Sequence, residues 1–485
     1  MSYQKFTKDI GIVSLTNLAV VLKGLIILSI LTKLLGAENY GIWAQLMVTV
    51  SLIIPIATLG LPYTLVRFLA AEKNKREIQD GFYSVISLIF VVGLIISLFL
   101  IIFSSSISNF FGSENPTLVK ILAFIILLEC LNLTFLNLFR AFQEMKKFSF
   151  LMLSQAFGDI GLIAVAVILG YGLFGVISAL LIIRITVFLI MGSIIIKKIG
   201  MKIPSFSRVK EYLSFGLPTM PGNFSTWVLQ SSDQYLIGYF LGATFVGYYA
   251  PGYAVGNIIF LFIVPLGFVL PAILSKLFDE NKINEVKICL KYSLKYFLAI
   301  AIPSVFGVSA LSKQLLTIFS TPEIASSGYL IVPFVSFGIL LLGSSAVIDQ
   351  ILSLVKKTIL DTKIWLTAAV LNLGLNFIFI PKFGILGAAF TTLIAYTLAF
   401  ILTWYYSFRE FQFEIDWKFI VKSIFASLLM TVFIIWFTPV ELLKTIIAII
   451  SGALIYGILI FLFKGFSKKE IEFLKELIKS SLHKI

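Results

Sequence analysis

The stretch that decides the fold is residues 231–249, which read SSDQYLIGYFLGATFVGYY. It places a carboxylate, Asp233, inside an apolar segment, and then a tight Leu-Gly-Ala-x-x-x-Gly turn leads into the next apolar segment. The same turn occurs 206 residues earlier at 35–41, and in both copies an aromatic residue follows two positions after the second glycine. A self-match at a fixed offset indicates an internal repeat. We therefore expect a membrane bundle that is built twice.

The composition is that of a membrane protein. The 485 residues have a mean hydropathy of +1.04, and 59% of them are hydrophobic while only 13% are charged. So little polar surface cannot cover so large an apolar core, and lipid is therefore expected to be the solvent. Two cysteines and one histidine leave no disulfide framework and no metal site. The first apolar run is too long for a signal peptide and is expected to be an uncleaved span.

The basic residues predict the topology. Apolar windows of about 20 residues, the length that crosses a bilayer, occur about fourteen times. If the N-terminus lies inside and the spans alternate, the inner segments carry 29 of the 38 Lys and Arg residues and the outer loops carry 3. This split follows the positive-inside rule and predicts that both termini are cytoplasmic. It also explains the net charge of +14 without a nucleic-acid partner.

Two further self-matches extend the repeat. The Gly-x-x-Gly sequences at 172–175 and 384–387 lie 212 residues apart, and the Lys-Lys pairs at 146–147 and 356–357 lie 210 apart. We therefore expect an all-α membrane protein with two six-helix bundles, related by a pseudo-two-fold axis along the membrane normal, plus two extra C-terminal helices. The predicted parts are an N-terminal bundle at 1–198, a cytoplasmic linker at 199–210, a C-terminal bundle at 211–408, helices 13 and 14 at 409–464, and an amphipathic cytoplasmic tail at 465–485.

This pattern resembles the MOP flippase superfamily, and within it the Wzx-type polysaccharide flippases. The resemblance covers the chain to about Lys464 and is carried by three motifs: Leu35-Gly36-x4-Gly41, Asp233-x-x-Leu-Ile-Gly-x-x-Leu-Gly-x4-Gly-Tyr-Tyr and Pro381-x-x-Gly384-Ile-x-Gly387-Ala-Ala. One departure is Gln234, because such families often place Arg directly after the Asp of the seventh span.

The resemblance implies a non-enzymatic protein of the cell membrane. It would move a polyprenyl-(pyro)phosphate-linked oligosaccharide from the cytoplasmic to the outer leaflet by alternating access. It would work as a monomer, beside polysaccharide polymerases or glycosyltransferases. No cofactor is expected, and a Na⁺ or H⁺ gradient is the candidate source of energy.

Charged residues inside the spans are the candidate site. Each costs about 2.5–3.5 kcal/mol at bilayer depth on insertion scales, so each needs a reason. The candidates are Lys23, Arg67, Glu129, Asp159, Arg184, Asp233 and Asp349. In the functional interpretation they line a polar cavity, where the three cations hold a pyrophosphate and the carboxylates meet sugar hydroxyls or a coupling cation.

The alternative is structural. The charges would then pair inside one bundle, Lys23 with Glu129 or Asp159 with Arg184, and would only fix the packing. Arg67 lies near the expected inner end of its span, where snorkelling to the interface explains it equally well.

Two rival functions make different demands on the sequence. A MATE-like ion-coupled multidrug or cation antiporter would need an acidic cavity, which Lys23 and Arg184 oppose. A membrane glycosyltransferase or ligase would need catalytic carboxylates on large outer loops. The longest outer loop, about 104–116, offers only Glu114.

The predicted topology can be tested by thiol labelling. In a chain without its two native cysteines, single cysteines at positions 115 and 320 should react with an impermeant thiol reagent added to intact cells. Single cysteines at 75 and 205 should react only after the membrane is opened. These positions lie in loops on the side rich in Lys and Arg, which the positive-inside rule places in the cytoplasm. Labelling at 75 or 205 in intact cells contradicts this topology.

Overall fold

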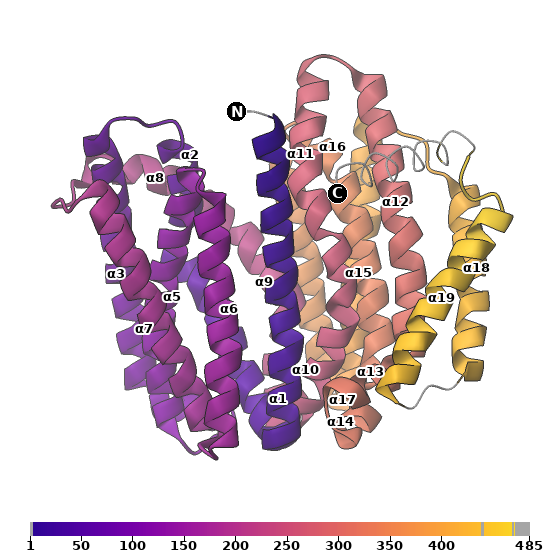
Figure 1. The fold of residues 1–485 in the computed structure, drawn as a ribbon, viewed down its shortest axis with the longest axis horizontal. Coiled ribbons are helices and arrows are strands. Elements are labelled where there is room, and N and C mark those ends of the chain that lie inside the picture. The colour runs from indigo at the N-terminus through magenta and orange to yellow at the C-terminus, as the bar shows by residue number, and fades with distance from the viewer. Residues whose placement is uncertain (1–2, 438–440, 468–469, 471–485) are drawn as a thin grey trace. The chain divides into compact units, whose positions relative to one another are not determined.

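The computed structural model describes residues 3–437, 441–467 and 470, and within these ranges the chain forms helices and no strands (Figure 1). The expected all-α membrane fold is confirmed, because eleven helices in the described part of the chain are long and apolar enough to cross a bilayer. Two of them, α1 (Tyr3–Thr58) and α17 (Thr358–Glu410), are interrupted by the non-helical glycines Gly36 and Gly384. The number of fourteen spans stays a prediction.

Two compact units make up the chain. The first consists of Met1–Pro251, Phe319–Ile324 and Trp365–Thr391, and the second contains the remaining residues. Some helices contribute to both units, including α17 and α10 (Ala243–Gly256). The two-bundle boundaries expected from the repeat stay a prediction, and most of the expected amphipathic tail lies outside the described residues.

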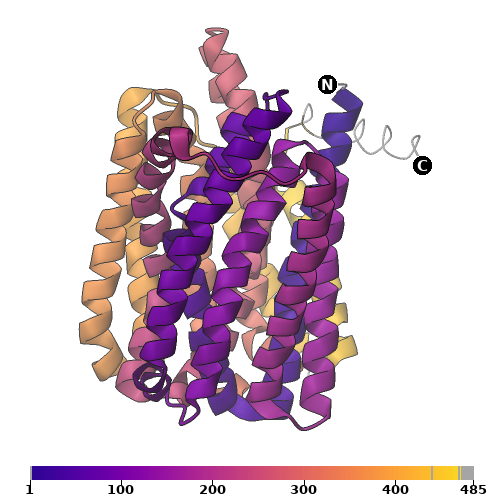
Figure 2. The ribbon, with the colours of Figure 1, turned by 90° about the vertical axis from the view of Figure 1, so that its left-hand side faces the viewer.

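The first unit is a bundle around α5. Besides α1 its elements are α2 (Leu61–Leu69), α3 (Lys75–Ile102), α4 (Ser104–Phe110), α5 (Pro116–Ala141), α6 (Met145–Ile168), α7 (Gly172–Ile199), η1 (Phe206–Arg208), α8 (Val209–Gly216), η2 (Leu217–Thr219) and α9 (Met220–Leu241). Helix α5 packs against α2, α3 and α7, while α6 packs against α1 and α7. Figure 2 shows these helices running side by side.

Local sequence explains where these helices begin. The side chain of Asn74 accepts a hydrogen bond from the amide of Arg76 at the start of α3, and Asn115 does the same for Thr117 at the start of α5. Such caps satisfy amides that have no partner within the helix. Pro116 follows the second cap at the first helical position, which its fixed φ angle suits.

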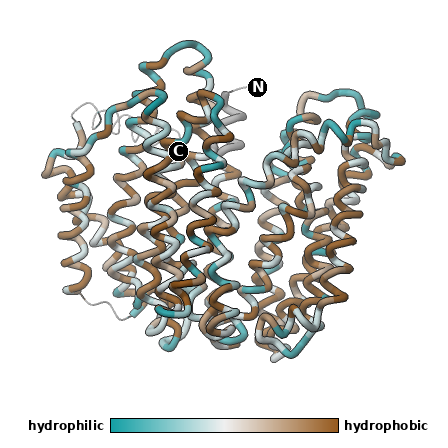
Figure 3. Tube along the Cα trace, turned by 180° about the vertical axis from the view of Figure 1, so that it is seen from behind, coloured by the Kyte–Doolittle hydropathy of each residue, from teal (hydrophilic) through white to brown (hydrophobic). Residues whose placement is uncertain are grey.

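The second unit is built around α12 (Ile283–Ala310). Its other elements are η3 (Asn257–Phe262), α11 (Val264–Asp279), α13 (Ser312–Phe319), α15 (Ile331–Ile348), α16 (Gln350–Leu354), α18 (Trp417–Phe437) and α19 (Leu442–Leu462), and α14 (Pro322–Gly328) is divided between the two units. Helix α12 packs against α15 and α18, and α18 packs against α19. In each unit the apolar residues fill the lengths of the helices, and hydrophilic residues gather where the chain turns (Figure 3).

The two copies of the Leu-Gly-Ala turn adopt the same backbone conformation. Gly36 has φ 78° and ψ 178°, and Gly242 has φ 95° and ψ 169°. This region of positive φ is open to glycine and strongly disfavoured for residues with a Cβ atom. Each turn therefore breaks a helix at the first glycine of the motif, as the matching sequences predict.

The second glycine of each motif packs against the other copy. A Cβ atom added to Gly41 would clash with the carbonyl oxygen of Ala243, and one added to Gly247 would clash with the carbonyl oxygen of Ala37. Both obstacles are backbone atoms, which cannot move aside like the end of a flexible side chain. The contact is reciprocal, and it fixes the end of one helical segment against its counterpart.

This contact predicts opposite effects at chemically identical substitutions. Gly41→Ala and Gly247→Ala should each lower the free energy of unfolding by about 1–3 kcal/mol or more, because overpacking displaces backbone. Gly24→Ala is the control, since Gly24 lies in the same long helix with nothing near its Cβ position. It should raise stability by about 0.5–1 kcal/mol. Thermal unfolding in detergent measures all three, and an equal loss for Gly24→Ala would contradict the account.

Candidate functional site

Four of the predicted site residues form one cluster in the first unit. Lys23 Nζ lies 3.1 Å from Asp159 Oδ2, and Arg184 reaches both Asp159 and Glu129. The residues come from α1, α6, α7 and α5, each from within the helical stretch that is apolar enough to cross the membrane. The apolar helices therefore bring two cations and two carboxylates together inside the membrane.

Arg184 uses its whole guanidinium group in this cluster. Its Nη1 and Nη2 atoms donate to the two carboxylate oxygens of Asp159 at 2.9 and 3.2 Å. Its Nε atom lies 2.5 Å from Glu129 Oε2. A forked contact of this kind is stronger and more directional than a contact from a lysine. The carbonyl oxygen of Arg184 also accepts a hydrogen bond of 3.1 Å from Asn132, which ties α7 to α5.

Burial differs across the cluster. The side chain of Asp159 is 1% exposed and that of Arg184 is 9% exposed, whereas Lys23 is 22% and Glu129 is 25% exposed. The buried pair is therefore the centre of the cluster, and Lys23 and Glu129 are its accessible ends. Removing one partner of a buried ion pair costs about 3–5 kcal/mol, because it leaves the other charge uncompensated.

The observed pairing agrees with one structural expectation and corrects the other. Asp159 pairs with Arg184 as expected. Lys23 pairs with Asp159 and not with Glu129, because Arg184 lies between the two carboxylates and occupies Glu129 itself. The two cations therefore share one central carboxylate. Whether this cluster also binds substrate stays a prediction.

The other three predicted residues lie elsewhere. Asp233 is buried on α9 and accepts hydrogen bonds from the Tyr249 hydroxyl and from the amide of Gln234. Arg67, at the end of α2, lies over the ring of Phe215, with Cζ 4.7 Å from the ring centroid. Asp349 belongs to the second unit, between α15 and α16, and accepts a hydrogen bond of 3.1 Å from the side chain of Gln350.

Uncharged polar residues escaped the sequence analysis. Asn132, three residues after Glu129, bonds the backbone carbonyl of Arg184, and nothing in the sequence marks that contact. In α17, buried Asn376 donates to the Asn372 side chain at 3.3 Å and accepts from the Thr391 hydroxyl. An amide or hydroxyl within an apolar run is a weaker signal than a charge, and its partner becomes visible only in the packed helices.

A second buried charge cluster lies in the second unit. Lys295 of α12 is 3.0 Å from Asp416, which precedes α18, and 2.9 Å from Glu470, which follows α19. The rings of Phe419 and Phe466 lie 5.1 and 5.6 Å from its Nζ atom. These contacts tie α12 to the segments that flank the last two helices.

Both carboxyl groups of this second cluster are held in the charged form. Burial raises the pKa of Asp416, but hydrogen bonds from Lys295 and the Phe419 amide outweigh it and hold the pKa below its usual value. Burial likewise raises the pKa of Glu470, and hydrogen bonds from the Ser467 amide and Lys295 lower it further than burial raises it. Both groups therefore stabilise the fold most when ionised.

Sequence comparison relates the chain to known protein families. Residues 6–278 match the profile of a family described as "Polysaccharide biosynthesis protein", and residues 218–378 match the MatE profile. An uncharacterized membrane protein, MJ1068 of Methanocaldococcus jannaschii, is 26% identical over 58% of this chain and 56% of that protein. The probable low-salt glycan biosynthesis flippase Agl15 of Haloferax volcanii is 25% identical over 55% of this chain and 57% of its own length. The chain thus spans a little over half the length of these relatives.

Solved structures share the fold. The lipid II flippase MurJ in its inward closed conformation superposes with a TM-score of 0.74 at 19% identity, covering 93% of this chain and 98% of that one. An inward-facing multidrug resistance MATE family transporter of the MOP superfamily gives a TM-score of 0.72 at 15% identity, covering 82% and 97%. At these identities the similarity shows the fold alone.

The Lys295 cluster makes stability depend on pH. The folded-state pKa values of Asp416 and Glu470 lie below their usual values of about 4, so their contribution is present above that pH and is lost as the pH falls through the folded-state values. The melting temperature should therefore fall as the pH is lowered from about 6 to 3. Glu470→Gln should lower it at pH 6 and flatten the profile. Glu280→Gln is the control, because that carboxylate forms an exposed pair with Lys282. A Glu470→Gln profile identical to that of the unmodified protein would contradict this account.

Proposed function

Because the chain belongs to the polysaccharide biosynthesis protein family, within the MOP superfamily, we propose that it moves a polyprenyl-(pyro)phosphate-linked oligosaccharide from the cytoplasmic to the outer leaflet. The oligosaccharide would serve assembly of a cell-surface glycan, and the protein would move it by alternating access without covalent chemistry. The glycan biosynthesis flippase among its relatives supports this class of substrate.

The observation that carries the proposal is the buried cluster around Asp159. A carrier of an anionic lipid needs cations inside the membrane, and free cations there are costly. Lys23 and Arg184 meet both demands, because each is neutralised by carboxylates while no substrate is present. The site is thereby kept stable without losing its positive groups.

Substrate binding would proceed by exchange of partners. A phosphate presents oxygen atoms that match the guanidinium fork as a carboxylate does. Within the cluster it would first meet Lys23, the more exposed of the two cations, and would then replace Glu129 at Arg184, while buried Asp159 keeps the two cations together. The released Glu129 could take up a proton or Na⁺, which would couple transport to an ion gradient.

The cellular setting follows from the same proposal. The protein would work in the cell membrane with both termini in the cytoplasm, as a monomer. Polysaccharide polymerases or glycosyltransferases would act on its substrate before and after the transfer across the membrane.

A MATE-like cation antiporter is the alternative, because the MatE profile matches part of the chain. An antiporter of organic cations needs uncompensated carboxylates in its cavity. In the first unit, Glu129 and Asp159 both contact cations. The cluster therefore favours an anionic substrate over a cationic one.

Three variants separate substrate binding from packing. Arg184→Gln should lower expression, since it leaves Asp159 with Lys23 alone, and should abolish flipping of lipid-linked oligosaccharide in proteoliposomes. Arg184→Lys keeps the charge without the fork and should retain partial activity. The double variant Arg184→Gln with Asp159→Asn restores charge balance, so it should recover expression and remain inactive.

The double variant decides between the two interpretations. If it recovers both expression and flipping, Arg184 only neutralises Asp159 and the substrate-binding role is wrong. Uptake of organic cations against a proton or Na⁺ gradient, without flipping of any lipid-linked sugar, would favour the antiporter.

A further inference from the structure

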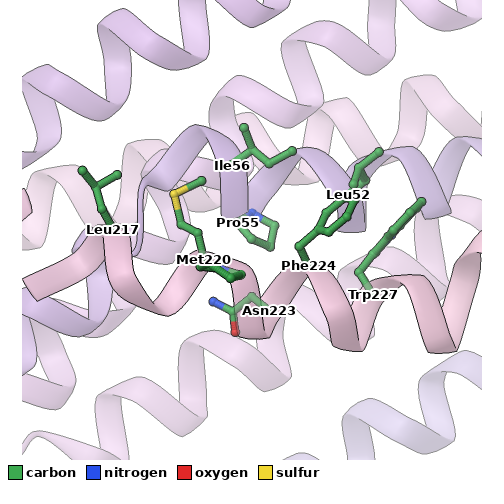
Figure 4. A pocket seen from close by; sticks show the side chains of 9 residues that line it. Leu52, Pro55, Ile56, Leu217, Met220, Asn223, Phe224 and Trp227 are labelled. Carbon is green, nitrogen blue, oxygen red and sulfur yellow. The ribbon is translucent and has the colours of Figure 1, made fainter. Parts of the chain in front are cut away.

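An apolar cavity of about 320 Å³ lies in the first unit between α1 and the start of α9. Its lining residues are Leu52, Pro55, Ile56, Leu217, Met220, Pro221, Asn223, Phe224 and Trp227. Figure 4 shows one side of the cavity following η2 and the start of α9 from Leu217 to Trp227, with side chains of α1 on the other side. Ten residues of helix span about 15 Å, so the cavity is long enough for an extended chain.

The chemistry of the lining selects a hydrocarbon. Asn223 is the only polar side chain among the nine, apart from the indole N–H of Trp227. That N–H is already bonded to the Ser51 hydroxyl at 3.1 Å and the Val48 carbonyl at 3.3 Å. A sugar would lose its hydrogen bonds to water here and gain few in return. An apolar chain loses none, and in a membrane protein the surroundings supply such chains.

A cation lies at the Leu217 end of the cavity. Arg67 stacks on Phe215, two residues before Leu217, and its side chain is exposed. Among the described residues Arg67 makes no ion pair, whereas Lys23, Arg184 and Lys295 are all paired with carboxylates. It is thus an accessible cation with its charge uncompensated.

Tight backbone packing holds the cation at this end. A Cβ atom on Gly216 would clash with the carbonyl oxygen of Leu59, and one on Gly60 would clash with the carbonyl oxygen of Gly216. The start of α2, which carries Arg67, is therefore pressed against the segment that leads into the cavity. The position of Arg67 relative to Leu217 is fixed by backbone contacts.

We propose that this cavity is a loading site for the lipid part of the substrate. The isoprenoid units next to the phosphate would lie along η2 and α9 between Leu217 and Trp227, and Arg67 would bind the phosphate. Both lie toward the end of these helices that the basic residues predict to be cytoplasmic, where the lipid must enter. The identity of the lipid follows from the function proposed above, on which this site assignment rests.

Photo-crosslinking tests the occupant. The full-length protein in nanodiscs is given a polyprenyl phosphate that carries a diazirine on the isoprene units next to the phosphate, and labelled peptides are identified by mass spectrometry. Labelling should fall within 52–56 and 217–227, and unlabelled polyprenyl phosphate should compete while phosphatidylglycerol should not. Labelling spread over other lipid-facing helices, or equal competition by phosphatidylglycerol, overturns the assignment.

Matched variants test each half of the site. Leu52→Trp fills the cavity and should reduce labelling at least about tenfold, whereas Leu189→Trp, at an exposed position on α7, should not. Arg67→Gln should weaken binding of polyprenyl phosphate about tenfold, the scale of one lost charge-assisted hydrogen bond. Arg140→Gln removes the same charge from an arginine that instead bonds Asn137 at 3.1 Å and should bind normally. If Leu52→Trp fails to fold, Arg67→Gln still tests the loading site, because unchanged binding of polyprenyl phosphate by that variant would overturn the assignment.

A flipping assay separates this site from the proposed function. If the unmodified protein flips lipid-linked oligosaccharide but shows no cavity labelling, the loading site is wrong and the function stands. If the cavity is labelled competitively but no lipid-linked sugar is flipped, the lipid site stands and the proposed function is wrong.

Discussion

The reciprocal contact between the two Leu-Gly-Ala turns is the constraint on which the first unit depends. Gly41 meets the carbonyl of Ala243 and Gly247 meets the carbonyl of Ala37, so each copy admits only glycine because of the other. This contact joins the part of α1 that continues to Leu52 and the end of α9, the helix that carries Asp233. The cavity and the Asp233–Tyr249 hydrogen bond are both positioned by helices that start from it.

Charge compensation is the second constraint. In hydrocarbon an ionised side chain without a partner is costly, and the described helices place Lys23, Arg184 and Lys295 against carboxylates. Asp159 serves Lys23 and Arg184 together, and Lys295 is shared by Asp416 and Glu470. The first arrangement fixes four transmembrane helices against one another. The second holds the segment before α18 and the segment after α19 against α12.

The sequence predicted features that are encoded locally. Composition and hydropathy predicted an all-α membrane fold, and the repeated glycines predicted where two helices break. The Asp159–Arg184 pair could be anticipated because both charges lie at similar depth in neighbouring spans. The partner of Lys23, the Asn132 contact and the role of Glu470 could not, since they depend on which helices touch. The cavity likewise arises from segments about 170 residues apart, and no motif marks it.

The neutrality of the Asp159 cluster has an electrical consequence. Two positive and two negative side chains that move together through the membrane field do no net electrical work, so this cluster would add no voltage dependence to reorientation of the empty protein. A bound phosphate group would make the loaded cluster negative. An inside-negative voltage favours outward movement of such a charge by about 2.3 kcal/mol per elementary charge per 100 mV. Under the proposed function, the loaded outward step would then respond to voltage through this cluster and the empty return step would not, which would give the cycle a direction.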